Sequence, residues 1–316
     1  MNLSGVTITC FAASYALALV LEGTRLLGRL PARHPLMLLI GAAGLFAHSV
    51  YLVNLAYREA SAREGVFASW YDWSLLTAWI LAAAYLALAA RRPANSVGIF
   101  LLPLVLVAIG LAMATRRLPP FAASRALGSW RIVHGGALLV GTVAVILGFA
   151  TGLMYLLHSY RLKHKLPPRP GLRLPSLEWL QRFNRETLWI STGLLAVGLT
   201  AGIVMNVSPT GPDVLWTDSV VLSSGALFLW LVAVTLFEAV YHPSRQGRKV
   251  AYLTLAHFLF LALALVLVVL GGHASRPRGG TAAAPRAARA DVEPRLETAR
   301  PSDRAARSAT GRGGRS

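Results

Sequence analysis

The chain has 316 residues, 55% of them hydrophobic and 14% charged, and its mean hydropathy is +0.55. Soluble domains carry roughly a quarter charged residues, so the composition excludes an ordinary soluble protein and indicates an integral membrane protein. The formal net charge of +18 is typical of nucleic-acid-binding proteins, but ten of the 31 basic residues are arginines that follow His273, and most others lie at the ends of apolar runs. Basic residues placed in this way orient a protein in the bilayer, so we expect no nucleic-acid partner.

The first apolar run contains Cys10, the single cysteine. One cysteine excludes a CxxC redox pair, a zinc site and a disulfide framework, and there is no CxxCH motif for attaching haem covalently to this chain. The residues before Val6 carry no basic group, and the apolar run from about Val6 to Leu27 is long enough to span a bilayer. We therefore expect a retained first helix rather than a signal peptide.

A membrane-spanning helix needs about 20 mostly apolar residues, and eight stretches of the chain qualify. Because every backbone polar group in lipid must be paired within its own segment, they predict an all-α fold, a polytopic membrane bundle of about eight transmembrane helices. The third and fourth spans are joined by the tight turn Arg91-Arg92-Pro93 and should form a hairpin. The predicted spans cover residues 5–24, 35–56, 73–90, 97–114, 132–157, 187–206, 219–240 and 250–271.

The bundle is predicted to form one domain, residues 1–273, followed by a tail, residues 274–316. The tail consists mainly of Ala, Arg, Gly, Pro and Ser with almost no large apolar side chains. It cannot bury enough surface to fold, so we expect it to be disordered.

The distribution of Lys and Arg between the connections predicts the orientation. The connections after spans 1, 3, 5 and 7 hold 15 of these residues, whereas those after spans 2, 4 and 6 hold 6. The first set should be cytoplasmic. Both termini and the connection between spans 6 and 7 are therefore expected outside the cytoplasm.

The longest cytoplasmic connection, residues 158–186, begins with a basic run that suits anionic lipid headgroups. Ser176 can cap a following helix, in which Leu177, Leu180 and Phe183 recur every three residues. We expect a short amphipathic helix that lies on the inner leaflet.

Ionisable residues inside spans are costly and are functional suspects by default. Glu22 and Glu238 lie near cytoplasmic ends of spans, and we interpret both as boundary charges in contact with water. No Asp, Glu, Lys or Arg lies at the middle of a predicted span, which argues against ion-coupled transport. Tyr71, Asp72 and Trp73 precede the third span and are typical of an aromatic anchor at the outer interface.

Histidine and tryptophan occur together at the outer ends of the last four spans. His134 opens the fifth span, Arg131 lies one helical turn earlier on the same face, and His273 ends the eighth span. The connection between spans 6 and 7 carries Trp216 and Asp218. Imidazole nitrogens are axial ligands of haem iron, a guanidinium can pair with haem propionates, and an indole can stack on a porphyrin. His and Trp are also common at headgroup depth, so the pattern alone leaves both interpretations open.

Two further histidines lie within spans, His48 in the second and His257 in the eighth. Either could be a transit ligand for haem crossing the bilayer, or a neutral histidine hydrogen-bonded between helices.

From about His48 to His273 the chain resembles the cytochrome c assembly family of haem-handling membrane proteins, in particular its CcsA/HemX-like branch. The segments that carry the resemblance are HSVYLVNLAYREASAREGVFASWYDWSLLTAW, SWRIVHGGALLVGTVAVILGFATGLMYLLHSYRLKHKL, LPSLEWLQRFNRETLWISTGLLAVGLTAG, DVLWTDSVVLSSGALFLW and GRKVAYLTLAHFLFLALALVLVVLGGHAS. The resemblance implies that His134 and His273 are axial ligands of a haem iron. Trp216-Thr217-Asp218 stands where the family has a loop ending in Trp-x-Trp-Asp-Pro.

The resemblance further implies a cytochrome c biogenesis factor in the bacterial cytoplasmic (inner) membrane. It would bind b-type haem transiently and non-covalently at the outer face and present it to apocytochrome c, with a membrane partner that has a large extracytoplasmic domain. Such a protein is a non-catalytic assembly factor or one subunit of a haem-attachment complex. The alternative is a HemX-like regulator or scaffold in tetrapyrrole metabolism, which acts through cytoplasmic contacts such as residues 158–186 and delivers no haem.

Overall fold

The computed structural model describes residues 7–27, 33–62, 69–118, 128–167, 171–208, 216–217, 219–240, 251–253 and 255–263. These residues belong to one compact unit, Met1–Arg276, and their regular secondary structure is entirely helical. Asp218, His273 and the tail 274–316 lie outside the described residues, so the predictions made for them stay predictions.

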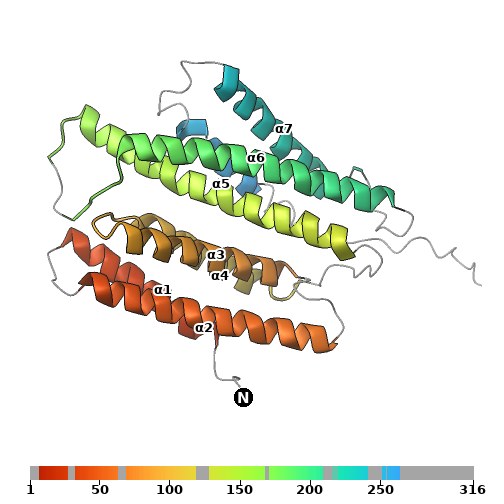
Figure 1. The fold of residues 1–316 in the computed structure, drawn as a ribbon, viewed down its shortest axis with the longest axis horizontal. Coiled ribbons are helices and arrows are strands. Elements are labelled where there is room, and N and C mark those ends of the chain that lie inside the picture. Colours follow the sequence, from red (N-terminus) through yellow and green to blue (C-terminus); the bar gives the residue numbers. More distant parts are fainter. Residues whose placement is uncertain are drawn as a thin grey trace, which may run out of the picture. The chain divides into compact units, whose positions relative to one another are not determined.

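The described residues form a series of α-helices in the predicted order, which confirms the all-α fold (Figure 1). A 3-10 turn, Thr24–Leu26, extends the first helix. A last helical segment covers residues 251–253 and 255–263. The helices are α1 (Ile8–Gly23), α2 (Arg33–Ala62), α3 (Trp70–Arg91), α4 (Gly98–Thr115), α5 (Gly128–Lys163), α6 (Leu177–Val207) and α7 (Ser219–Val240).

Five of these helices, α2 to α6, are long and apolar enough to cross a membrane, which identifies a multi-pass membrane protein. Helix α1 has 16 residues, and the apolar parts of α7 and the last segment are Val221–Phe237 and Ala251–Leu263. All three are shorter than the roughly 20 residues that a full span needs. The prediction of full-length spans is thus confirmed for five helices and stays a prediction for the other three.

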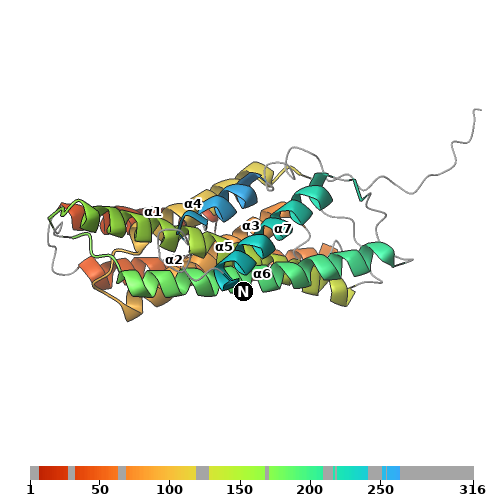
Figure 2. The ribbon, with the colours of Figure 1, turned by 90° about the horizontal axis from the view of Figure 1, so that it is seen from above.

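Neighbouring helices along the chain pack against one another in pairs, α1 with α2, α3 with α4, α5 with α6 and α6 with α7. Figures 1 and 2 show the long α5 and α6 side by side, and the predicted hairpin of the third and fourth spans is present as α3 and α4. One hydrophobic core lies mainly among α1 to α4 around Phe11, Tyr85 and Leu102. A second lies among α5, α6, α7 and the last segment around Leu188 and Leu231.

The helix directions define two ends of the bundle. At one end α5 begins, α6 ends and α7 begins, and we call it the His134 end. At the other end α3 and α5 stop and α6 begins, and we call it the basic end because Arg25, Arg91, Arg92, Arg161 and Lys163 lie there.

At the basic end the guanidinium of Arg25 ties α1 to the turn between α3 and α4. It donates hydrogen bonds to the carbonyls of Asn95 at 3.0 Å and Pro93 at 3.2 Å, and its Nε lies 3.1 Å from a carboxylate oxygen of Glu22. Glu22 is only 1% exposed, so its interpretation as a boundary charge in water is wrong. A buried carboxylate needs a partner, and Arg25 supplies it. The side chain of Glu238 lies outside the described residues.

The turn between α3 and α4 also holds the connection between α5 and α6. The Ser96 N–H donates to the Arg173 carbonyl at 2.8 Å, and the Ser96 hydroxyl donates to the Gly171 carbonyl at 2.8 Å. Gly171 has a φ of +105°, and a Cβ there would overlap the carbonyl of Arg25, so the position requires glycine. The connection is therefore anchored to the bundle by hydrogen bonds from Ser96 to two of its backbone carbonyls.

Helix α6 corrects the prediction of a separate helix on the inner leaflet. Ser176 is its N-cap, and the Ser176 Oγ accepts a hydrogen bond from the Trp179 N–H at 3.3 Å, as the sequence predicts. The helix then continues without a break to Val207. Leu180, expected to face lipid, is fully buried in the core of the bundle. Leu180 therefore packs against protein, and the segment forms the first turns of α6 instead of a separate short helix.

The aromatic residues at the start of α3 also differ from their interpretation as an interfacial anchor. Asp72 is 1% exposed and forms a capping box with Ser69, which satisfies two N–H groups at the helix start. The hydroxyl of Tyr71 is hydrogen-bonded to that of Tyr51 on α2. Trp73 packs closely against Gly135 on α5. These side chains join α3 to its neighbours.

Candidate functional site

His134 lies near the start of α5 and faces α6. Its Nδ1 is 2.6 Å from the backbone carbonyl of Gly198. A carbonyl oxygen can only accept a hydrogen bond, so Nδ1 carries the proton and the lone pair of the neutral ring lies on Nε2. The side chain is half-buried, and Nε2 has no hydrogen-bond partner among the described residues. The structure thus leaves one nitrogen of His134, Nε2, without a hydrogen-bond partner among the described residues.

Two glycines on α6 lie against α5 at this site, Gly202 beneath the His134 ring and Gly198 beneath Leu138. A Cβ added at Gly202 would lie 2.9 Å from Cε1 and 3.0 Å from Nδ1 of His134, and one added at Gly198 would lie 2.8 Å from Leu138. Small residues four apart let two helices approach closely within a membrane. These glycines are not among the predicted site residues, although the Gly-x-x-x-Gly spacing within an apolar helix is a signal for them.

The other predicted residues of this site are only partly described. Arg131 lies one turn before His134 on α5, is partly exposed, and makes no ion pair with a described residue. Trp216 is 54% exposed and lies in the connection between α6 and α7, at the His134 end. Asp218 and His273 fall outside the described residues. The helix directions therefore bring His134, Arg131 and Trp216 to one end of the bundle.

His48 is a fully buried histidine between α1 and α2. The Phe11 ring stacks on it at a centroid distance of 4.1 Å with an interplanar angle of 3°, and the Tyr15 hydroxyl is 3.4 Å from its Nδ1. A hydrogen bond between α1 and α2 is thus present at His48, as one of the two interpretations predicts. Phe11 occupies one face of the imidazole, so a haem-transit role at His48 would require α1 and α2 to separate.

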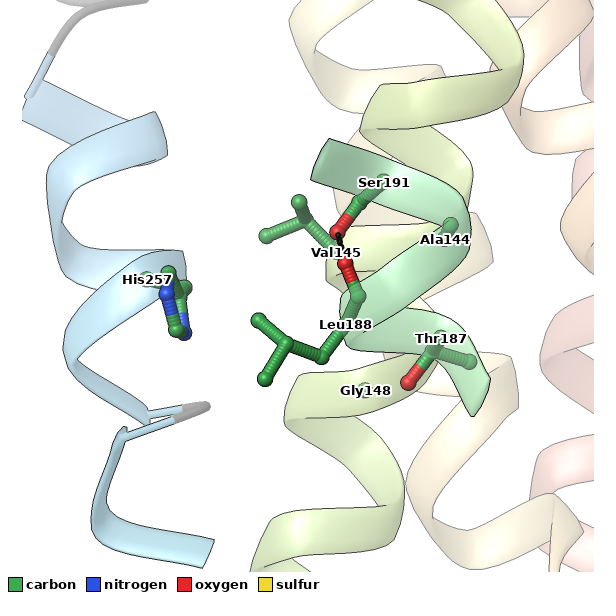
Figure 3. Close-up of a pocket in the computed structure, with 7 residues that line it drawn as sticks. All are labelled: Ala144, Val145, Gly148, Thr187, Leu188, Ser191 and His257. Carbon is green, nitrogen blue, oxygen red and sulfur yellow. Dashed lines mark hydrogen bonds between the residues drawn. The ribbon is translucent and has the colours of Figure 1, made fainter. Parts of the chain in front are cut away.

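His257 is 2% exposed and lies in the last helical segment against α5 and α6 (Figure 3). Its ring nitrogens make no well-formed hydrogen bond to a described residue, although the ring approaches the Leu253 carbonyl on the preceding turn. The adjoining cavity has a volume of about 10 Å³ and is lined by Thr187 and Ser191 among others. That is room for about one water, whereas ligand pockets measure about 300–1,000 Å³. Haem transit at His257 would also require helix separation.

The fold defines a multi-pass α-helical membrane protein, and at one end of its bundle the Nε2 of His134 has no hydrogen-bond partner among the described residues. The sequence model of the cytochrome C assembly protein family matches residues 67–273, about two thirds of the chain, and the protein belongs to this family. The family assigns it a role in cytochrome c biogenesis and is associated with haem handling. No curated protein and no solved structure matches the chain. The match includes His134, Trp216, Asp218, His257 and His273, and it begins after His48.

Proposed function

We propose that this protein binds haem at the His134 end of its bundle and presents it for attachment to apocytochrome c. The observation that carries the proposal is His134, whose Nδ1–H is held by the Gly198 carbonyl while Nε2 has no partner among the described residues. Imidazole in this state is an axial ligand of haem iron. Membership of the cytochrome c assembly family supports haem as the ligand.

His273 is the proposed second axial ligand, and the packing of the last segment supports it. The rings of Phe149 on α5 and Phe258 on the last segment stack with centroids 3.9 Å apart. Phe149 lies fifteen residues after His134, and His273 lies fifteen residues after Phe258. The span predicted from the sequence over residues 250–271 would run antiparallel to α5, and equal counts along two helices of equal rise would then bring the two histidines level.

The remaining residues of the proposed site have supporting roles. Trp216, with its exposed indole, offers a face for the porphyrin, and Asp218 shapes the same loop. Arg131 offers a cation for the propionates, because a guanidinium pairs well with a carboxylate. His134 and His273 would together hold the iron of a non-covalently bound b-type haem and so limit side reactions during its transfer. A membrane partner with a large extracytoplasmic domain would complete the complex.

The basic end supports the orientation predicted from the sequence. Arginine and lysine gather there, and such residues remain on the cytoplasmic side of a membrane. The His134 end, both termini and Trp216 are then extracytoplasmic in the bacterial inner membrane. In a chain without Cys10, a membrane-impermeant maleimide should label Trp216→Cys in intact cells and label Lys163→Cys only after permeabilisation. The reverse pattern would overturn the orientation.

The direct test is the haem absorption spectrum of the purified protein. Wild type should carry haem, and His134→Ala combined with His273→Ala should lose it. His164→Ala is the matched control, because His164 is exposed at the basic end and its removal should leave the spectrum unchanged. A haem-free wild type, or full haem retention in the double variant, would refute the proposed site.

The second candidate is a HemX-like regulator or scaffold in tetrapyrrole metabolism. The observation that favours it is Trp216-Thr217-Asp218, which stands in place of the family's Trp-x-Trp-Asp-Pro. Deleting the gene separates the two functions. Loss of c-type cytochromes supports haem delivery, whereas a change confined to the abundance of glutamyl-tRNA reductase supports the regulator.

A further inference from the structure

We propose that Gly198 and Gly202 are positioning residues that select the Nδ1–H tautomer of His134 and so fix Nε2 as its ligand atom. This inference deepens the proposed function and rests on it where haem is concerned. Its basis is the contact of a histidine ring with helix backbone: Nδ1 lies 2.6 Å from the Gly198 carbonyl.

The donor at Nδ1 determines which nitrogen can bind a metal. A neutral imidazole has one N–H and one lone pair. Because the Gly198 carbonyl accepts the Nδ1–H, the lone pair must be on Nε2. Donation of the other ring N–H to a carbonyl orients a ligating histidine and raises its basicity. Gly198 therefore acts on the ligand through its backbone, which no side-chain replacement at that position removes.

The missing side chain at Gly202 allows the ring to reach that carbonyl. A Cβ at this position would lie 2.9 Å from Cε1 and 3.0 Å from Nδ1 of His134, closer than carbon atoms pack. The ring would have to move away from α6, and the 2.6 Å contact with the Gly198 carbonyl would lengthen. Gly202→Ala should thus remove the preference of His134 for the Nδ1–H tautomer without altering any polar side chain.

Helix α6 supplies a matched control. Gly193 lies on the same helix, and a Cβ added there meets nothing within 4 Å. Gly193→Ala and Gly202→Ala carry the same change in helix propensity, so a difference between them reports the contact with His134. The expected difference is specific to the ligand nitrogen and does not depend on helix stability.

The first experiment is independent of haem. In the full-length protein labelled with ¹⁵N-histidine and studied in detergent micelles at mildly alkaline pH, His134→Gln identifies the signals of His134 among the eight histidines. Wild type and Gly193→Ala should show a protonated Nδ1 and an unprotonated Nε2. Gly202→Ala should show exchange between the two tautomers. An Nε2–H tautomer in wild type would overturn the inference, whatever happens to any variant.

The second experiment measures haem binding by absorbance titration. Loss of an outer hydrogen-bond partner typically weakens metal binding by about 10- to 100-fold, so Gly202→Ala should bind haem more weakly by about this factor. Added imidazole should restore its absorption bands, and Gly193→Ala should match wild type. If wild type has the Nδ1–H tautomer yet binds no haem, the proposed function fails and the tautomer assignment stands. If the Gly202→Ala variant keeps the wild-type tautomer of His134 and the wild-type affinity for haem, the role proposed for Gly202 is wrong.

Discussion

Replacing Arg25 with methionine tests whether a buried ion pair holds the basic end of the bundle together. Arg25 is 7% exposed, and it donates to two backbone carbonyls while its Nε lies 3.1 Å from the Glu22 carboxylate. Arg25→Met removes all of these interactions and leaves a carboxylate that is 1% exposed. Hydrogen bonds from a charged donor contribute about 1.5–3 kcal/mol each, and removal of one partner of a buried pair costs about 3–5 kcal/mol.

We therefore expect Arg25→Met to lower the free energy of unfolding by about 3–5 kcal/mol. The measurement is denaturant unfolding in detergent micelles, followed by circular dichroism. Glu22→Gln should cost less, because Arg25 keeps its two carbonyl acceptors. The double variant should be less destabilised than the two single losses predict together, with a coupling energy of about 0.5–3 kcal/mol.

The control for Arg25 is a second Arg–Glu pair near the basic end. The Nε of Arg182 lies 3.0 Å from Glu186, but the side chains are 74% and 51% exposed. An exposed pair is screened by water and contributes about 0–1 kcal/mol, so Arg182→Met should be nearly neutral. Equal losses in Arg25→Met and Arg182→Met would refute the reasoning, because burial would then have no influence on the energy of the pair.

Two further predictions concern the joints made by α3. Gly135→Ala should lower the free energy of unfolding by about 1–3 kcal/mol through overpacking, because the added Cβ would lie 2.5 Å from the Trp73 ring. Gly136→Ala is the control and should be near neutral, because its added Cβ meets nothing within 4 Å. Equal thermal stability of the two variants would contradict the contact between Trp73 and Gly135. Asp72→Ala should lower the free energy of unfolding by about 0.5–2 kcal/mol and speed amide hydrogen exchange in the first turn of α3, because the Asp72 carboxylate accepts a hydrogen bond from the Ser69 N–H at 2.9 Å. Unchanged exchange would show that the capping box is not formed.

The apolar runs predict most of the fold because each span must satisfy its own backbone in lipid. Helix boundaries for α3, α4 and α7 follow from the runs within a few residues. The apolar runs did not predict the full length of α6, because its first ten residues carry a polar face that is equally compatible with a surface helix. Only the packing of Leu180 into the core distinguishes the two arrangements. The interpretation of Glu22 as a boundary charge was wrong because its burial depends on packing with Arg25 and with a turn distant in sequence, which the apolar runs do not reveal.

The candidate site was predicted in part. His134 and the connection that carries Trp216 follow from the order of spans, and the family match agrees with that order. The hydrogen bond to Gly198 could not be predicted, because it involves a backbone carbonyl 64 residues away. A histidine spacing carries no information about which nitrogen is free. For His48 and His257 the sequence left two roles open, and their close packing favours structural roles in the state described.

The unbroken course of α6 has a mechanical consequence. At a rise of 1.5 Å per residue its 31 residues extend about 46 Å, well beyond a hydrocarbon layer about 30 Å thick. Its first turn carries Trp179, beneath the Arg92 guanidinium at 4.6 Å from the ring centroid, and its last turns carry Gly198 and Gly202. If α6 moves as one rigid helix, a displacement of its first turn at the basic end would also move the Gly198 carbonyl and its contact with His134 at the other end of the bundle.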